Sequence, residues 1–403
     1  MSTVLVINAG WEQRPLIDAA RKVATRLIAV HPSADVADDL PVDRLAVMDL
    51  RDTAKILKLA REEKIDAVIT DECDYSAFSA ALVAEALQLP GAGIGPAGRA
   101  VNKALQRDAI AAAGIRQPQY AVCANVDEAR TAAREIGYPL VVKPVDSRGG
   151  LGVRFVHQES ELADAVINAI GNSISWQIIV EQCIEGTQFV VDGYVFPRAG
   201  YQALAVSSKR MVPGTPVAAD IISPAEADPE VINAVRAYDA KIVAALGLRS
   251  GMTHGEYMVN TAGEVYLVEV ANRGGGVWIS AKYVPAICGV DTTAQLVEDA
   301  LGTGRDLFEQ SGGVKQRAGR VHFLIPPADQ ALIGVVGEDA ARALPGVECL
   351  WVKPIDAGRI ASTMQTDLDR QGMAILSGDT TSAVDAVLAQ LQQTLMFQTG
   401  KSA

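Results

Sequence analysis

Short apolar runs alternate with helix-like stretches at the start of the chain, and this pattern restricts the fold more than any other feature. The apolar runs cover residues 4–7, 27–30 and 67–70, and helical patterns cover residues 15–25, 53–64 and 76–87. Alternation of this kind is typical of βαβ units around a parallel sheet. The sequence therefore predicts a Rossmann-like domain over residues 1–95.

The first strand-to-helix turn of this domain carries a single glycine, Gly10, and not the GxGxxG pattern. That pattern lets backbone approach a dinucleotide pyrophosphate closely. Its absence counts against a nicotinamide-dependent dehydrogenase, the function that the βαβ pattern alone would suggest.

Strand and helix signals mix differently beyond residue 96. A helix containing Lys103 and Arg107 is predicted over residues 99–113, and strands over 140–144, 153–156, 178–181, 189–195 and 201–207. A long amphipathic helix over 227–246 precedes a hairpin formed by residues 253–259 and 264–270, then a mostly helical stretch over 280–301. Short strands and one helix over 381–393 follow. The chain is thus predicted to combine an α/β part with α+β parts.

Composition excludes several classes of protein. The chain has 403 residues, 49% of them hydrophobic, and its net charge is −12, which argues against general binding to nucleic acid or to an anionic membrane. No run of about 20 apolar residues predicts a membrane span. The N-terminus lacks a signal-peptide pattern. The five cysteines are scattered, without CxxC, so neither a disulfide framework nor a zinc site is expected. These features favour a cytoplasmic enzyme.

The predicted hairpin places two carboxylates opposite each other. If the turn is centred between Ala262 and Gly263, partner numbers sum to 525 and Glu256 faces Glu269. Two carboxylates in such a pair repel each other, and their apolar neighbours suggest a buried setting. A divalent cation between them would relieve the repulsion, with Asn272 as a third oxygen ligand. A solvent-facing carboxylate pair at a strand edge is the alternative.

A glycine-rich loop and a glycine-flanked arginine are further candidates. Lys143 ends a strand before the loop over residues 146–152, where Gly149, Gly150 and Gly152 would let backbone N–H groups approach phosphate. Taken alone, the loop is a weak signal, and an ordinary hairpin turn with incidental glycines is the alternative. Arg273 precedes three glycines, and beside a metal site it would hold phosphate or carboxylate through its two-pronged guanidinium. A surface arginine at a strand end is the alternative.

Histidines are expected to be structural. The four, His31, His157, His254 and His322, lack metal-ligand spacing, and no GxSxG motif supports a serine nucleophile. His254 is the strongest exception, because it lies two residues before Glu256.

The ordered set of motifs resembles the ATP-grasp superfamily of ligases. It comprises Lys103, Lys143-Pro144 with the loop to Gly152, Glu181-Gln-Cys-Ile-Glu-Gly186, Glu256, and Glu269-Val-Ala-Asn-Arg273. The resemblance implies that residues 1–95 help to bind a carboxylate substrate. It also implies that residues 96–305 clasp ATP between two subdomains and that residues 306–403 complete the site. The segment over 366–379 is similar to the tail of carboxylase-type and amino-acid-ligase members.

The resemblance also implies roles for individual residues. ATP phosphates would contact Lys103, Lys143 and the loop with Ser147, Gly149 and Gly150, and adenine would contact Glu181 and the backbone of Cys183 and Ile184. Gln188 occupies a position where the family often has a ribose-binding acid. Glu256, Glu269 and Asn272 match the usual Mg²⁺ ligands, for which Mn²⁺ could substitute. Arg273, with Asn272, would steady the acyl phosphate, and Lys209 and Arg210 could bind an acceptor carboxylate, although a surface hairpin explains that pair as well.

The implied reaction joins a small carboxylic acid or amino acid to an amine. A carboxylate would attack the γ-phosphate of ATP, and the amine would then displace phosphate from the acyl phosphate. The loop sequences are most similar to those of L-amino-acid ligases and related carboxylate–amine ligases, and the superfamily suggests a homodimer. Two alternatives stay open: an enzyme that activates bicarbonate, like biotin carboxylase or aminoimidazole carboxylases, and a non-catalytic ATP-binding module.

Overall fold

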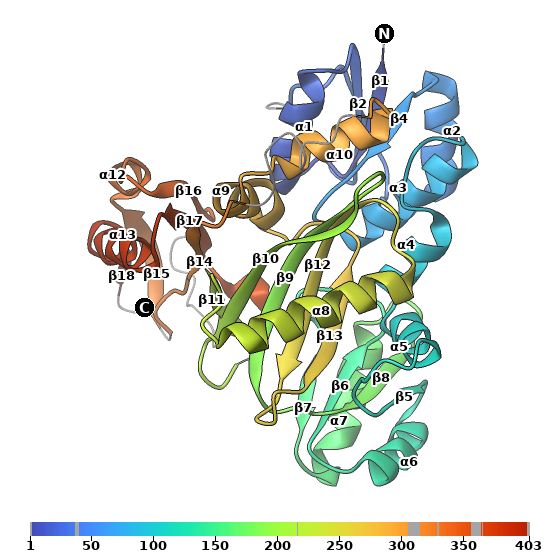
Figure 1. Cartoon of the computed structure of the whole chain (residues 1–403), viewed down its shortest axis with the longest axis vertical. Coiled ribbons are helices and arrows are strands. Elements are labelled where there is room, and N and C mark those ends of the chain that lie inside the picture. Colours follow the sequence, from blue (N-terminus) through green and yellow to red (C-terminus); the bar gives the residue numbers. More distant parts are fainter. Residues whose placement is uncertain are drawn as a thin grey trace.

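The computed structural model of the chain describes residues 2–36, 40–215, 217–304, 315–328, 330–355, 364 and 366–400. Within this part of the chain, strands form sheets of four, eight, two and four strands. Figure 1 shows the N-terminal sheet at one end of the molecule and a small antiparallel sheet at the other, with long strands and α8 between them. None of the helices in these ranges is both long and apolar enough to cross a membrane.

The predicted parallel sheet is confirmed. Its order is β3-β2-β1-β4, from strands β1 (Thr3–Ile7), β2 (Arg26–His31), β3 (Arg44–Val47) and β4 (Ala67–Ile69), all in parallel pairs. No strand was predicted at β3, although Leu45, Ala46 and Val47 are apolar, and only Ala46 of its four residues is buried.

Helices cover both faces of the parallel sheet. They are α1 (Arg14–Arg21) after the short turn η1 (Trp11–Gln13), α2 (Thr53–Glu63), α3 (Asp74–Ala86) and, from much later in the chain, α10 (Thr292–Leu301). Val297 and Ala300 of α10 share a core with Leu16 of α1 and Val4 of β1. A helix expected to belong with residues 96–305 thus completes the N-terminal core.

The single helix predicted over 99–113 is wrong. Two helices, α4 (Ile94–Val101) and α5 (Lys103–Ala112), meet at Asn102, whose side-chain oxygen accepts hydrogen bonds from the backbone of Ala104 and Leu105. Asparagine satisfies the free N–H groups of a helix start in this way. Lys103 therefore lies at the first residue of α5 instead of inside a helix.

A four-stranded antiparallel sheet follows in the order β5-β8-β6-β7. Its strands are β5 (Tyr120–Cys123), β6 (Leu140–Pro144), β7 (Arg154–Val156) and β8 (Ile178–Gln182). Apolar residues of α6 (Val126–Ile136) and α7 (Glu159–Gly171) share one core with this sheet.

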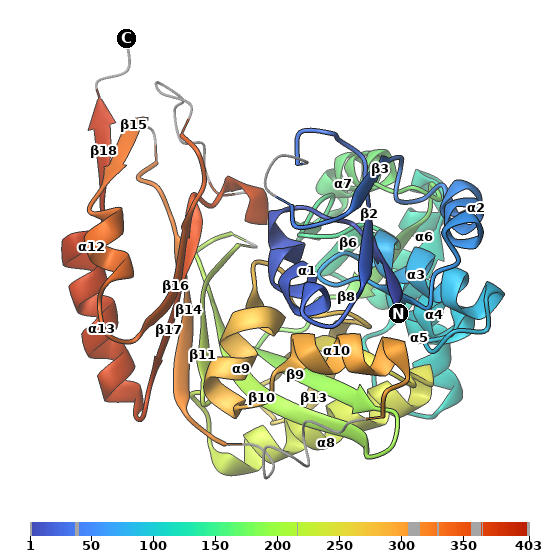
Figure 2. The same ribbon diagram turned by 90° about the horizontal axis from the view of Figure 1, so that it is seen from above.

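The eight-stranded antiparallel sheet is the centre of the molecule. Its order is β13-β12-β9-β10-β11-β14-β17-β16, with β9 (Thr187–Phe196), β10 (Gly200–Met211), β11 (Ala218–Ser223), β12 (Gly251–Val259), β13 (Val265–Ala271), β14 (Ala318–Leu324), β16 (Val347–Val352) and β17 (Gly372–Gly378). Helix α8 (Pro229–Leu246) packs on one of its faces. Figure 2 shows the strands of the C-terminal region standing beside β11.

The predicted boundary between residues 305 and 306 lies at the edge of residues 305–314, outside the described part of the chain. On either side of that gap the strands belong to one sheet, because β14 pairs with β11. The remaining C-terminal elements are α12 (Glu338–Arg342), η4 (Asp367–Asp369), α13 (Thr381–Thr394) and the paired strands β15 (Ala331–Val336) and β18 (Met396–Gly400).

The helical stretch predicted over 280–301 is divided. It consists of a π-helical turn, η3 (Ile279–Tyr283), the short α9 (Val284–Cys288) and α10. The break falls at Gly289, with a φ of +79°, and Asp291 caps the start of α10. A left-handed glycine commonly ends a helix.

Candidate active site

Glu256 and Glu269 face each other across β12 and β13, as the sequence predicts. Nearer the turn the sum of the two partner numbers is one lower than the predicted 525, because Tyr257 pairs with Leu267. The register changes between Glu256 and Tyr257, which leaves Val268 as an extra residue in β13. This irregularity resembles a β-bulge, which lets two strand ends keep different registers. The opposed pair is thus correct although the pairing near the turn is not the expected one.

Each of these carboxylates is bound by a different lysine. Lys209 Nζ lies 2.8 Å from Glu256 Oε1, and Lys103 Nζ lies 2.8 Å from Glu269 Oε2. The amide of Gln188 also donates to Glu256 Oε2, at 2.8 Å. Two lysines therefore offset the repulsion that the sequence led us to assign to a divalent cation. Among the described residues, no three His, Cys, Asp or Glu side chains converge as a metal cluster.

Burial and ion pairing act in opposite directions on these groups. Burial opposes the charge on Lys209 and Lys103, but Glu256 and Glu269 respectively raise the pKa of each lysine. Burial likewise opposes ionisation of Glu256, but Lys209 and His254 hold the pKa of this carboxyl below its usual range. All three groups are therefore charged at neutral pH.

Arg273 is held at the junction with the N-terminal sheet. Its guanidinium donates to both carboxylate oxygens of Asp74, at 3.0 and 3.1 Å, and to the backbone oxygen of Gly274 at 2.9 Å. Burial disfavours charge on both partners, but their pairing raises the pKa of Arg273 and lowers that of Asp74. Asp74 begins α3, so the N-terminal region orients an arginine that the sequence assigns to catalysis.

Lys103, Glu269 and Arg273 line one cavity of about 310 Å³ with Ser147 and Asp74. Lys103 Nζ also donates to the backbone oxygen of Ser147 at 3.0 Å, which ties the glycine-rich loop to α5. The loop glycines Gly149, Gly150 and Gly152 all have positive φ. An added Cβ at Gly152 would meet Pro144 at 2.7 Å, whereas Gly149 and Gly150 face open space. The structure thus brings the loop to the predicted phosphate-binding lysine.

Lys143 belongs to a second buried cluster, at the four-stranded sheet. Lys143 Nζ and Arg107 Nε each lie 2.7 Å from a different oxygen of Glu181. Burial would raise the pKa of Glu181, but these two cations lower it to about 2. Burial lowers the pKa of Lys143, and Glu181 counteracts this effect. Both carboxylate oxygens of Glu181 are occupied, so an adenine contact from this residue would fall to its backbone.

Sequence reasoning missed the role of Arg107. Its side chain is 1% exposed and also donates to the backbone oxygens of Leu267 and Val268, which links α5 to the hairpin. The available signal was its position four residues after Lys103, a spacing that puts both side chains on one helix face. Next to this cluster, the Cys183 N–H donates to the Pro139 oxygen at 3.1 Å.

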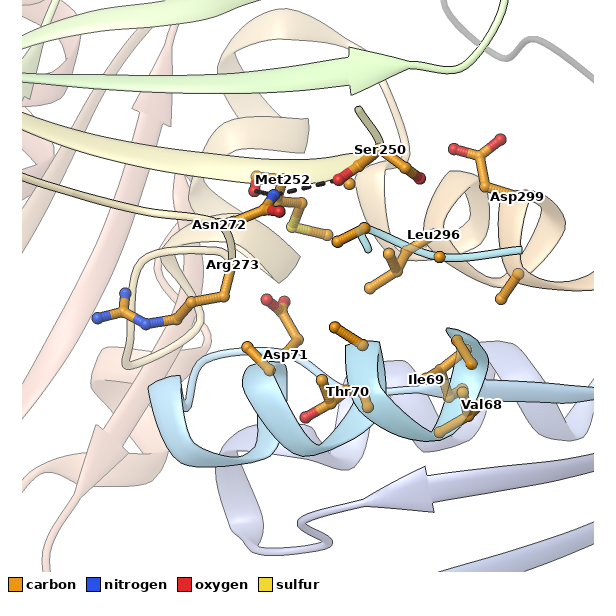
Figure 3. A pocket seen from close by; sticks show the side chains of 18 of the residues that line it. Val68, Ile69, Thr70, Asp71, Ser250, Met252, Asn272, Arg273, Leu296 and Asp299 are labelled. Carbon is orange, nitrogen blue, oxygen red and sulfur yellow. Dashed lines mark hydrogen bonds between the residues drawn. The ribbon is translucent and has the colours of Figure 1, made fainter. Parts of the chain in front are cut away.

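Asn272 is not brought to the two glutamates. Figure 3 shows its side chain bound near the start of β12, where Nδ2 donates to the backbone oxygens of Ser250 and Met252 at 3.1 and 3.0 Å. It lines a separate pocket of about 80 Å³ with Asp71 and Arg273. Residues an odd number of positions apart in an extended strand face opposite sides, and Asn272 is three residues after Glu269. Its Oδ1 is buried and has no hydrogen-bond partner among the described residues.

The side chains of Lys209 and Arg210 also lie in different places. Neighbours on β10 point to opposite faces of the sheet. Lys209 is buried against Glu256, whereas Arg210 forms an exposed pair with Glu226 at 2.6 Å. The structure therefore does not bring Arg210 to the site with Lys209, and its expected part in binding an acceptor carboxylate lacks that geometric support.

Three acidic residues of the N-terminal region hold the loop that follows Arg273. Asp71 accepts from the N–H of Gly274 at 2.7 Å, and Glu12 and Glu72 accept from Val277 and Trp278, each at 3.2 Å. Val277 and Trp278 have positive φ, a conformation that costs energy outside glycine. Burial raises the pKa of all three acids. Their contacts join positions more than 200 residues apart, so no local pattern in the sequence announces them.

Comparison with known proteins identifies the domain. Residues 136–282 match the model of the ATP-grasp domain. An uncharacterized protein of Sinorhizobium fredii is 25% identical over 97% of this chain and 82% of its own length. A formate-dependent phosphoribosylglycinamide formyltransferase of a Synechococcus strain is 28% identical over 45% of this chain, and the match spans about half (48%) of that relative.

The fold is shared over the whole chain with a solved structure. The L-amino acid ligase of Bacillus licheniformis superposes with a TM-score of 0.85, covering 100% of this chain and 99% of the ligase at 21% identity. With the domain match, this similarity confirms the α/β and α+β architecture that the motifs predict. The chain therefore contains a region, residues 136–282, that matches the ATP-grasp domain, and it shares its fold with this ligase.

Proposed function

We propose that the protein is an ATP-dependent carboxylate–amine ligase that forms an amide through an acyl phosphate and releases ADP and phosphate. The observation that carries this proposal is the opposed pair Glu256 and Glu269, each bound to its own lysine, with Arg273 in the cavity that Lys103 and Glu269 line. A site with paired carboxylates and several fixed cations suits the transfer of a charged phosphoryl group.

The reaction has two steps. A carboxylate oxygen of the substrate attacks the γ-phosphorus of ATP, the bond from that phosphorus to the bridging oxygen breaks, and ADP leaves. The amine nitrogen then attacks the acyl carbon, the bond to the phosphate oxygen breaks, and the nitrogen loses a proton. Lys103 and Lys209 would neutralise charge during the first step, and Arg273 would stabilise the negative oxygen of the second.

Glu256 and Glu269 would hold Mg²⁺, or Mn²⁺, together with the nucleotide phosphates. Hard carboxylate oxygens on directly opposed strand positions fit such a cation, which binds few protein ligands when phosphate supplies the rest. When bound, the cation would neutralise phosphate charge. Asn272 would then serve the substrate side of the site, where it lines the same small pocket as Arg273 and where its Oδ1 has no hydrogen-bond partner among the described residues.

The second cluster would bind the nucleoside end of ATP. Lys143 and the loop with Ser147, Gly149 and Gly150 would approach the phosphates, and the backbone of Glu181, Cys183 and Ile184 would lie along the adenine. Gln188 donates to Glu256, so a contact to ribose would require it to leave that partner. The loop would exclude water from the acyl phosphate.

The names of the similar proteins support activation of a carboxylate. One is a ligase of L-amino acids and the other depends on formate, which is itself a carboxylate. We propose an amino acid or another small carboxylic acid as the first substrate and an amine as the second. A cytoplasmic homodimer is the proposed form of the enzyme.

The test is ADP release from Mg·ATP with amino acids offered singly and in pairs, with and without bicarbonate. We expect ADP only with a carboxylate and an amine together, and a product whose mass equals their sum less one water. ADP release that follows bicarbonate would replace this proposal with a carboxylase. ATP binding without turnover on any of a broad set of carboxylates would favour a non-catalytic module.

A further inference from the structure

His254 and Asp192 form a buried pair beside the opposed glutamates. They are direct partners across β12 and β9, and His254 Nδ1 lies 2.7 Å from Asp192 Oδ1. The side chains are only 11% and 4% exposed. The other ring nitrogen, Nε2, lies 3.8 Å from Glu256 Oε1. The imidazole therefore stands between a fixed carboxylate and a predicted metal ligand.

The same imidazole lies under the loop that follows Arg273. A Cβ added to Gly275 would lie 2.7 Å from Nδ1 and 2.9 Å from Cε1 of His254. Real Cβ atoms do not approach other atoms so closely, so the ring fills the space that a side chain at position 275 would need. The glycine at this position permits the backbone of the loop to rest on the histidine.

Within the described ranges, the hydrogen bond with His254 is the only one that the side chain of Asp192 makes. Its Oδ2 is buried and lacks a partner there, so the carboxylate is held through His254. A buried carboxylate is costly unless something pairs with it. This cost makes the orientation of the ring well defined, because turning His254 away would leave Asp192 unpaired.

We propose that His254, held by Asp192, is a positioning residue that fixes Glu256 and the loop carrying Arg273 relative to each other. The inference rests on the proposed function, because it concerns the geometry of the predicted cation site. His254 touches no reacting atom in this scheme. The ring contacts both Glu256 and the backbone at Gly275, and so it fixes the distance between the carboxylate and the loop that carries Arg273. Without the ring this distance would no longer be fixed.

The first test measures cation binding directly. Mn²⁺ is titrated into the full-length protein with saturating ADP, and free Mn²⁺ is followed by electron paramagnetic resonance. For His254→Ala we expect Mn²⁺ affinity to fall at least fivefold. ADP affinity measured in EDTA should stay within twofold of the wild-type value, because His254 does not belong to the cluster of Arg107, Glu181 and Lys143 that is proposed to bind the nucleoside. Asp192→Asn should give an intermediate loss, since the amide still accepts a hydrogen bond but lacks the charge.

A second histidine–aspartate pair provides the control. His322 Nδ1 lies 2.8 Å from Asp220 Oδ1 in the same sheet. Asp220 pairs with Arg210, so this pair faces away from Lys209 and the glutamates. His322→Ala should lower stability by a similar amount without changing Mn²⁺ affinity. Equal losses of affinity in both histidine variants would overturn the proposal, because they would report general destabilisation.

A double variant tests the contact with the loop. Gly275→Ala alone should weaken Mn²⁺ binding, because its methyl group would strike the ring. In combination with His254→Ala the two closest contacts disappear and only that with Ile279 Cβ, at 3.0 Å, is left, so the loss in the double variant should be smaller than the sum of the two single losses. Additive losses would overturn the proposed contact. If the wild type binds no nucleotide with Mn²⁺, the proposed function fails; if it does and His254→Ala equals it, only this inference fails.

Discussion

Glu256 and Glu269 stand directly opposite each other in one hairpin, yet each is neutralised by a lysine from a different element. Lys209 comes from β10 in the same sheet, and Lys103 comes from the start of α5. The two carboxylates therefore connect the central sheet to the start of α5. A bound phosphate or cation would compete for these same ion pairs, so ligand binding and the packing of these elements are linked.

Lys209→Met should destabilise the protein in a way that divalent cations correct. The substitution leaves Glu256 buried beside Glu269 with its main cation removed, and breaking a buried ion pair typically costs about 3 kcal/mol or more. We expect a lower melting temperature and a larger rise on adding Mg²⁺ than the wild type shows. Differential scanning calorimetry with and without Mg²⁺ measures both effects.

The double variant Lys209→Met/Glu256→Gln controls for lost packing. Removal of both charges should restore much of the melting temperature, because no unpaired carboxylate remains. It should also abolish the extra response to Mg²⁺. A Mg²⁺ response in Lys209→Met no larger than that of the wild type would contradict the view that a cation can occupy the space between the glutamates.

Arg273→Ala should separate ATP binding from turnover. The guanidinium lines a cavity with Lys103 and Glu269 and is anchored on Asp74, whereas Arg107, Lys143 and Glu181 do not line that cavity. Loss of one fixed donor to a developing negative charge costs about 100-fold or more in rate. We expect ADP release to fall by that factor while the dissociation constant for ATP changes less than threefold. Isothermal titration and a coupled ADP assay supply the two values.

Arg342→Ala is a suitable control for removal of an arginine. Arg342 forms a surface pair with Glu338 on α12, at 2.9 Å and with 47% of its side chain exposed. Its replacement should change neither the rate of ADP release nor the dissociation constant for ATP. Turnover of Arg273→Ala at the rate of Arg342→Ala would remove Arg273 from its assigned role.

The fold was predictable where local patterns decide it. The parallel sheet, the hairpin and the long α8 follow from apolar periodicity, and the motif order indicated the ATP-grasp architecture. The predicted helix boundaries were wrong where one residue overrides the pattern: Asn102 caps a new helix inside a predicted one, and Gly289 ends another through its left-handed backbone. Strand β3 was not predicted, because its short apolar run over residues 45–47 lies within a stretch that is otherwise rich in charged residues.

The site was only partly predictable, because sequence shows residue types and not partners. The Glu256–Glu269 pairing was predicted from an assumed turn centre, and it holds only because the register shifts between Glu256 and Tyr257. The lysines that bind the two glutamates come from other elements, and the acids that hold the loop after Arg273 lie about 200 residues away. Strand alternation could have separated Lys209 from Arg210 beforehand, since neighbours on one strand face opposite sides.

Glu181→Gln should remove a contribution to the free energy of unfolding that depends on pH. The folded pKa of Glu181 is about 2 and its ordinary value is 4.5, so its ionised form is stabilised by about 3 kcal/mol. This contribution is complete above pH 4.5 and is lost as the pH falls towards 2. The difference in unfolding free energy between wild type and variant should therefore narrow over that range. Urea unfolding at several pH values measures it.

A surface aspartate with a similar pKa calibrates that result. Asp49 also has a pKa lowered to about 2, through hydrogen bonds from Arg51, but its side chain is 53% exposed. Solvent screens such pairs, so they contribute little to stability. Asp49→Asn should change the pH dependence far less than Glu181→Gln. Equal effects of the two variants would mean that burial of the Arg107–Glu181–Lys143 cluster does not strengthen it.

Asp239→Asn should show the opposite dependence on pH. Asp239 is fully buried on α8, where it accepts hydrogen bonds from Tyr257, at 2.5 Å, and Tyr201. Burial raises its pKa to about 7, although both tyrosines counteract the shift.

The native state therefore holds a proton that the unfolded chain releases near pH 4, and wild-type stability should fall by up to about 4 kcal/mol as the pH rises from 4 to 7. The asparagine variant lacks this titration, so its stability relative to the wild type should improve over that interval. Urea unfolding at pH 5 and pH 8 decides the matter, and a gap between the two proteins that stays constant or widens with pH would show that Asp239 is ionised in the folded state.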